Sequence, residues 1–115
     1  MVNCHCRDCQ RAGGAGFSPT VVVPAADFHV TQGRPRFYES GADSGNTARR
    51  AFCGDCGSPL FASSSARPQF VGIRAGSLDD PGWFRAAVDV WTASAQPWDT
   101  LAADTIKFPA APVRS

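Results

Sequence analysis

No long hydrophobic run and no marked excess of charge of either sign occur in this 115-residue chain, and these absences exclude several kinds of protein. A membrane-spanning helix needs roughly 18–20 apolar residues, and no stretch approaches that length. Eleven Lys and Arg face ten Asp and Glu, so the net charge of +1 provides neither a basic surface for nucleic acid nor a polybasic membrane anchor. With 43% hydrophobic residues, the composition predicts a single globular domain over residues 1–115 that binds no nucleic acid and no membrane.

A secretory leader is also missing from the start of the sequence. Met1-Val2-Asn3 leads directly into cysteines, without the basic and apolar segments of a signal peptide. We therefore expect a cytoplasmic protein, whose thiols are kept free by the reducing compartment. The odd number of cysteines, five, likewise argues against a disulfide framework.

What the sequence does have is cysteines at metal-ligand spacing. Cys4, Cys6 and Cys9 are close neighbours in the sequence, and Cys53 and Cys56 form a second Cys-x-x-Cys motif in which each cysteine is followed by glycine. Thiolates hold zinc tetrahedrally at about 2.3 Å, and such short motifs bring ligands together without long-range closure. We therefore predict that all five cysteines are metal ligands, with zinc favoured over an iron–sulfur cluster.

Three other interpretations of these cysteines are weaker. A thioredoxin-like redox pair would need a βαβ pattern around its Cys-x-x-Cys, and none is visible. Haem attachment would need histidine directly after the second cysteine, where Gln10 and Gly57 stand instead. Buried free cysteines are common as small hydrophobic residues, but two Cys-x-x-Cys pairs are unlikely to arise by chance.

The remaining pattern predicts an all-β fold with minimal helix. Eleven Gly and nine Pro leave no room for a long amphipathic helix, and one short helical stretch is expected at Gln10–Ala12 before Gly13-Gly14. Asp79-Asp80-Pro81-Gly82 predicts a turn, and the Pro/Ala-rich tail from Phe108 to Ser115 predicts an extended strap. The predicted strands are Phe17–Val23, Arg36–Tyr38, Ala48–Phe52, Leu60–Phe61, Gln69–Ala75 and Ala87–Trp91.

Taken in order, these features resemble the glutathione-dependent formaldehyde-activating enzyme family, which also includes centromere protein V. The segments that carry the resemblance are Cys4–Arg11, Phe17, Phe52–Leu60, Gly76–Pro81 and the pair Trp91 and Trp98. The resemblance implies a zinc-dependent β-tent fold built from small antiparallel sheets with two zinc sites. It also implies that Cys4, Cys6 and Cys9 hold a catalytic zinc, and that Cys53 and Cys56 supply half of a structural site.

One expected feature of that family is not found. Its members usually carry a further Gly-x-Cys-x-Cys-Gly segment before the triplet, which completes the structural site, so the resemblance implies an N-terminally shortened domain. A strand would then be missing from a sheet edge, and a homodimer would cover that edge. Alternatively, Cys53 and Cys56 combine with two thiols of the triplet into one closed four-sulfur site.

The chemistry depends on how many protein ligands the zinc has. Three ligands leave a fourth position for water or substrate, whereas four make the site structural. Three thiolates give the Zn²⁺ centre a formal charge of −1, which suits binding a substrate thiolate better than acidifying water. The resemblance implies the substrates of a carbon–sulfur lyase: a thiol such as glutathione and a small aldehyde, formaldehyde, which combine into an S-hydroxymethyl adduct. The alternative is a non-catalytic, zinc-stabilised binding module.

Several other polar and aromatic residues near these motifs have two interpretations each. Arg7 and Arg11 flank the triplet and are candidates for binding the glutathione carboxylates, or they are ordinary surface charges. His5 is either a proton shuttle or, as we expect, a residue that points outward. The three tryptophans, which either line a pocket mouth or belong to the core, are expected in the core: Trp83, Trp91 and Trp98.

Overall fold

The computed structural model describes residues 1–41 and 45–111, and these form two compact units along the chain. The first unit contains Met1–Thr20 and Asp80–Ser115, and the second contains Val21–Asp79. Strand β2 (Ser18–Pro24) begins in the first unit and ends in the second. The sulfur triplet, Cys4 with Cys6 and Cys9, belongs to the first unit, whereas Cys53 and Cys56 belong to the second.

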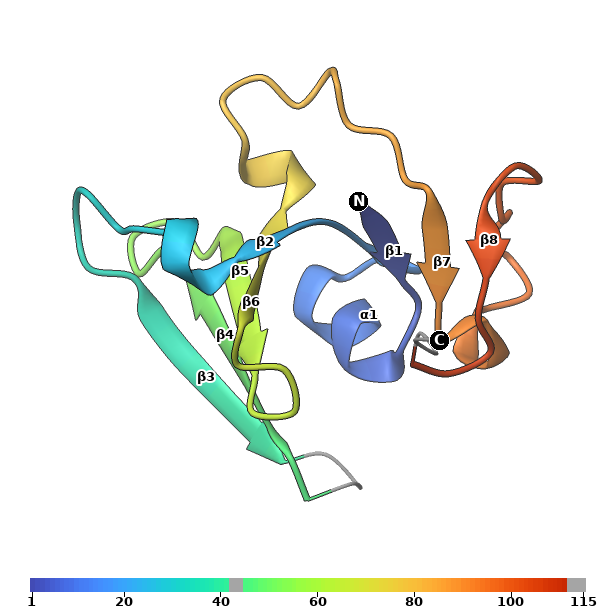
Figure 1. Ribbon diagram of the computed structural model, residues 1–115, viewed down its shortest axis with the longest axis horizontal. Helices are drawn as coiled ribbons and strands as arrows, with labels where there is room; N and C mark the ends of the chain where they lie inside the picture. Colours follow the sequence, from blue (N-terminus) through green and yellow to red (C-terminus); the bar gives the residue numbers. More distant parts are fainter. Residues whose placement is uncertain (42–44, 112–115) are drawn as a thin grey trace. The chain divides into compact units, whose positions relative to one another are not determined.

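The first unit is a short mixed sheet with one helix. Its strands are hydrogen-bonded in the order β2-β1-β7-β8, with β1 (Val2–Cys4) between β2 and β7 (Val88–Val90) and with β8 (Ile106–Lys107) at the end (Figure 1). β1 runs antiparallel to β2 but parallel to β7, and β7 runs parallel to β8. Helix α1 (Arg7–Gly13) follows β1 almost directly, and the 3₁₀ turn η3 (Thr92–Ser94) follows β7.

Helix α1 is short because both of its ends are specified by the sequence. Cys6 is the N-cap, with an extended backbone and a sulfur that accepts a hydrogen bond from the Cys9 N–H. Gly14 closes the helix in the left-handed conformation, with φ +70°, and its N–H donates to the Gln10 carbonyl. The helix therefore places Cys9 one turn after Cys6.

The second unit is an antiparallel meander. The strands β3 (Arg36–Gly41), β4 (Thr47–Phe52), β5 (Pro59–Ser64) and β6 (Phe70–Arg74) pair in sequence order, and the end of β2 follows β6. The 3₁₀ turns η1 (Ala25–Asp27) and η2 (Ala75–Ser77) also belong to this unit. The ring of Phe61 contacts those of Phe28 and Phe37, which gives the meander its own apolar cluster.

The fold confirms the mostly-β prediction, and every predicted strand appears with shifted ends. The predicted helix is longer than expected, and two short strands, β1 and β8, were not predicted. The parallel pairs that these two strands make with β7 also differ from the purely antiparallel arrangement that the resemblance implies. Within the described residues, no helix is long and apolar enough to cross a lipid bilayer.

Two further predictions concern the surface of the protein. The tail contacts the chain after β7, since Phe108, Pro109 and Ala110 accept backbone hydrogen bonds from residues 91–93. Residues 109–111 form bends, and residues 112–115 of the predicted extended strap lie outside the described residues. The prediction that the tryptophans belong to the core is wrong. Trp83, Trp91 and Trp98 are 54%, 40% and 70% exposed, because the core of so small a domain is built from smaller side chains.

The left-handed C-cap of α1 predicts a stability effect that is independent of packing. A Cβ on residue 14 would meet no atom within 4 Å, so Gly14→Ala tests the backbone conformation alone. We expect the substitution to cost roughly 1–2 kcal/mol, measured by urea denaturation followed by circular dichroism. The matched control is Gly76→Ala in η2, which also has open space but no left-handed φ, and should change stability by less than about 0.5 kcal/mol. Equal effects of the two substitutions would contradict this explanation.

Candidate metal centre

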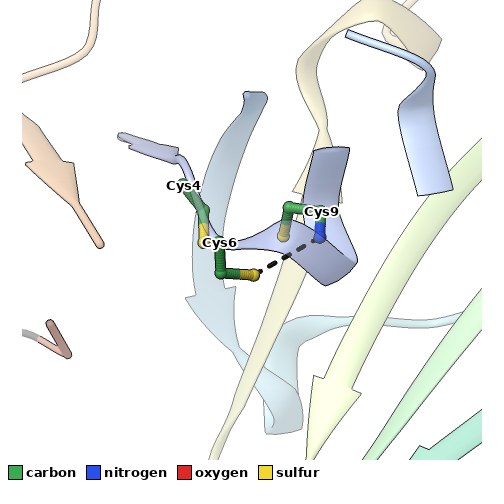
Figure 2. A group of neighbouring side chains, drawn as sticks. All are labelled: Cys4, Cys6 and Cys9. Atoms are coloured by element: carbon green, nitrogen blue, oxygen red, sulfur yellow. Dashed lines mark hydrogen bonds between the residues drawn. The ribbon is translucent and has the colours of Figure 1, made fainter. Parts of the chain in front are cut away.

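The sulfur triplet forms a compact cluster in the first unit. The Sγ atoms of Cys4, Cys6 and Cys9 all lie within 4.8 Å of one another, and Figure 2 shows the three side chains converging from the end of β1 and from α1. Cys9 is buried, while Cys4 and Cys6 are partly exposed. Four ligands around a tetrahedral zinc at 2.3 Å lie about 3.8 Å apart, so sulfurs within 4.8 Å of one another are close to the separation that metal binding needs.

Local backbone geometry explains why the three sulfurs meet. Alternate residues of an extended chain point to the same side, so Cys4 and Cys6 share one side and His5 points to the other. At Cys6 the chain enters α1, and the first helical turn brings the side chain of Cys9 to the same side as those of Cys4 and Cys6. The Cys9 N–H donates to the Cys6 sulfur over 3.3 Å, a contact that favours a negatively charged sulfur at this position (Figure 2).

The electrostatics of the cluster fit a cation. Neighbouring thiols and burial raise the pKa of Cys4 far above its ordinary value. The pKa of Cys6 is lowered by Cys4 but raised more by Cys9 and by burial, so the net direction is also upward. Two unit charges 4 Å apart repel by about 4 kcal/mol at an effective dielectric constant of 20, so three adjacent thiolates need a compensating positive charge. The donor set and its crowding therefore fit a soft divalent ion such as zinc.

His5 corrects an expectation from the sequence. Its outward orientation, expected for a residue between two ligands, is wrong, since His5 is 1% exposed. Its Nε2 lies 2.7 Å from Oδ1 of Asp89, and its Nδ1 lies 3.1 Å from Oδ2 of Asp99. Each ring nitrogen therefore lies within hydrogen-bond distance of a carboxylate oxygen. The aspartates carry no local sequence signal for this role.

Asp89 is the more deeply buried of the two carboxylates. Burial by itself would raise its pKa, but hydrogen bonds from His5 and from the Thr105 hydroxyl lower it below its ordinary value. Asp89 stands between Val88 and Val90 in β7 and is 1% exposed. A buried charge of this kind persists only where hydrogen bonds compensate for its lost hydration.

Gln10 links the metal centre to the chain after β7 and was also missed by the sequence analysis. Its side-chain Nε2 donates to the carbonyls of His5, at 2.7 Å, and of Ser94, at 3.0 Å. Its Oε1 accepts from Gln96 and from the guanidinium of Arg7. A buried amide with all of these contacts holds the start of α1 and the segment around η3 in one arrangement.

The two candidate substrate-binding arginines lie on the exposed side of α1. Arg7 and Arg11 are four residues apart, which places them on one face of the helix. The Arg11 guanidinium lies 3.8 Å from Asp8, but 69% of its side chain is exposed, so this pair leaves it accessible. Both cations can therefore be reached by an anionic ligand from solvent.

Cys53 and Cys56 lie in the turn between β4 and β5, in the second unit. The Gly57 N–H donates to the Cys53 carbonyl at 2.7 Å, and Gly57 adopts a left-handed φ of +78°, as a tight Cys-x-x-Cys turn requires. The Ser58 hydroxyl and backbone lower the pKa of the exposed Cys56 thiol. The role of this pair as zinc ligands stays a prediction. No disulfide joins any of the five cysteines, all of which lie within the described residues.

Comparison with known protein families supports the resemblance drawn from the motifs. The family model described as glutathione-dependent formaldehyde-activating enzyme matches residues 1–94, which include all five cysteines, His5 and Asp89. Asp99 and Thr105 lie beyond the matched residues. No curated protein matches the chain.

The clustering of the sulfurs predicts that each one contributes strongly to metal affinity. Loss of a group that merely orients a ligand costs about 10–100-fold in affinity, so loss of a ligand should cost more. We expect Cys6→Ser to weaken Zn²⁺ binding by more than about 100-fold, measured by competition with a chromophoric chelator. Ser63→Ala, which changes a hydroxyl on β5 in the second unit, serves as the control and should bind like the wild type. Unchanged affinity in Cys6→Ser would remove this residue from the centre.

Proposed function

The chain belongs to the glutathione-dependent formaldehyde-activating enzyme family, and on that premise we propose that it forms or cleaves thiol–aldehyde adducts at a zinc ion held by Cys4, Cys6 and Cys9. Family membership implies formaldehyde activation or a related activity. The finer assignment, a carbon–sulfur lyase that acts on S-hydroxymethylglutathione-like adducts, is our proposal. The observation that carries it is the convergence of three sulfurs, not four, in the described cluster.

The proposed reaction balances without any oxidant or reductant. The glutathione sulfur bonds to the carbonyl carbon of formaldehyde, the thiol proton ends on the carbonyl oxygen, and S-hydroxymethylglutathione results. In the reverse direction the carbon–sulfur bond breaks and the hydroxyl proton returns to sulfur. Zinc, when bound, would supply a position at which a substrate thiol is held deprotonated.

The protein's own residues would bind and orient the thiol substrate. The triplet leaves one side of a tetrahedral ion to an exogenous sulfur, and the partial exposure of Cys4 and Cys6 supports access from solvent. Arg7 and Arg11, on the helix that carries Cys9, are suited to hold the two carboxylates of glutathione. The glutathione sulfur would then be held beside the ion in a defined orientation, which lowers the entropic part of the reaction barrier.

The second candidate function is a zinc-stabilised binding module without turnover. It follows from the alternative in which Cys53 and Cys56 join two triplet thiols in one closed site. Such a site would have no position for a substrate thiol. The two functions make opposite predictions for Cys56→Ser.

Magnetization-exchange spectroscopy with glutathione and formaldehyde tests the proposed reaction directly. The zinc-loaded chain should accelerate the interconversion of free glutathione and its hydroxymethyl adduct, and Cys6→Ser should abolish that acceleration. Cys56→Ser should retain the acceleration under our proposal. If the wild type gives no acceleration and Cys56→Ser weakens zinc binding, the closed module is the correct function instead.

The arginines predict a specific effect on glutathione binding. We expect Arg11→Ala to raise KM for glutathione about 3–10-fold with little change in kcat, as fits a partly exposed charge pair worth about 1 kcal/mol. The control is a substrate without carboxylates, 2-mercaptoethanol, whose KM should not change in the same variant. An equal rise for both thiols would show that Arg11 does not bind the carboxylates.

A further inference from the structure

We propose that His5 is a positioning residue of the metal centre: held between Asp89 and Asp99, it fixes the backbone that joins Cys4 to Cys6 and thereby sets the separation of their sulfurs. This inference rests on the proposed metal centre. It adds a role for side chains that lie on the opposite side of the chain from the sulfurs, and one of them, Asp99, lies beyond the residues that the family model matches.

Every polar group of His5 is engaged. Its backbone N–H donates to the Val90 carbonyl at 3.0 Å, and its carbonyl accepts from Gln10 Nε2 at 2.7 Å. Its two ring nitrogens bond Asp89 and Asp99, so a single residue between two ligands has four anchors. Fixing a backbone position in this way removes conformational freedom that metal binding would otherwise have to restrict.

The anchors come from three separate parts of the first unit. Gln10 belongs to α1, Asp89 and Val90 belong to β7, and Asp99 lies in the segment after η3. Because the His5 bonds run to all of them, a displacement of the Cys4–Cys6 segment would break contacts in several directions. The sulfur separation is therefore tied to the sheet and not only to the short Cys-x-Cys sequence.

Both aspartates are themselves held in place. Asp89 accepts a hydrogen bond from the Thr105 hydroxyl, and its carbonyl accepts from the Phe108 N–H at 2.9 Å. Asp99 comes close to the chain after α1, since a Cβ on Gly16 would lie 3.1 Å from its carboxyl carbon. Only glycine at residue 16 allows this approach without displacement of Asp99. The Asp99 N–H also donates to the Gln96 carbonyl at 3.0 Å, so both carboxylates that contact His5 belong to residues with further contacts of their own.

Because His5 is buried, it is suited to position the neighbouring cysteines and not to contact a substrate. The residue is 1% exposed, and its ring packs against Phe17 with the centroids 5.3 Å apart. The alternation of side chains along the extended segment directs the imidazole away from the sulfurs. Its effect on the reaction must therefore pass through the backbone of Cys4 and Cys6.

Cobalt substitution measures this effect without any enzymatic assay. Thiolate-bound Co²⁺ has charge-transfer and ligand-field absorption bands that report the number and geometry of its sulfur ligands. We expect His5→Ala to weaken Co²⁺ binding about 10–100-fold and to shift the ligand-field bands, and Asp99→Asn to do so about 3–10-fold. Asp99→Asn preserves the size of a side chain that is 10% exposed, so it keeps the test valid if His5→Ala does not fold.

Conservative replacement and a matched control complete the experiment. The amide nitrogen of His5→Gln reaches about as far as Nε2, so this variant should recover most of the affinity through Asp89. His29→Ala, which changes the other histidine of the chain at an exposed position, should match the wild type. A wild-type spectrum and affinity in both His5→Ala and Asp99→Asn would overturn the proposal, as would lower thermal stability with an unchanged spectrum. If the wild-type chain itself binds no Co²⁺, the proposed metal centre fails together with this inference.

Discussion

The mutual repulsion of three closely spaced sulfurs is the constraint on which the first unit depends. Cys4, Cys6 and Cys9 bring their Sγ atoms within 4.8 Å of one another, where neighbouring thiols and burial raise the pKa of Cys4 and of Cys6. A cluster of this kind is unfavourable as three thiolates alone and becomes favourable around a divalent cation. Binding of a divalent cation at this cluster would therefore also stabilise the first unit.

The chain around the sulfurs is organised to maintain that arrangement. The side facing away from them carries His5, whose ring meets two carboxylates, and the buried amide of Gln10 connects its carbonyl to the segment around η3. Polar groups buried at this depth are stable only when each has its partners. A small domain with few large core residues thus uses hydrogen bonds, as well as apolar packing, to orient its candidate metal ligands.

Local sequence patterns predicted the strands and the clustering of the three sulfurs, but not the side chains that surround the cluster. The density of Gly and Pro, the β-branched runs and the cysteine spacing each act over a few residues, and they correctly predicted a mostly-β fold and the convergence of the triplet. The contacts of His5 join residues 84 and 94 positions apart, so no local pattern contains them. Strands β1 and β8 were missed because two or three residues are too few to show an alternating pattern. Both strands are defined by parallel pairing with β7, a contact that no local pattern contains. The exposed tryptophans show that residue type alone does not decide burial in so small a domain.

The coordination of the ion separates an enzyme from a structural module, and X-ray absorption at the zinc edge measures it most directly. For the chain loaded with a single equivalent of zinc and free of added thiol, our account predicts three sulfur neighbours at about 2.3 Å and one lighter neighbour at about 2.0 Å. Addition of glutathione should replace the lighter neighbour by a fourth sulfur. Four sulfurs in the absence of added thiol would contradict the account, because the ion would then have no position at which to bind a substrate.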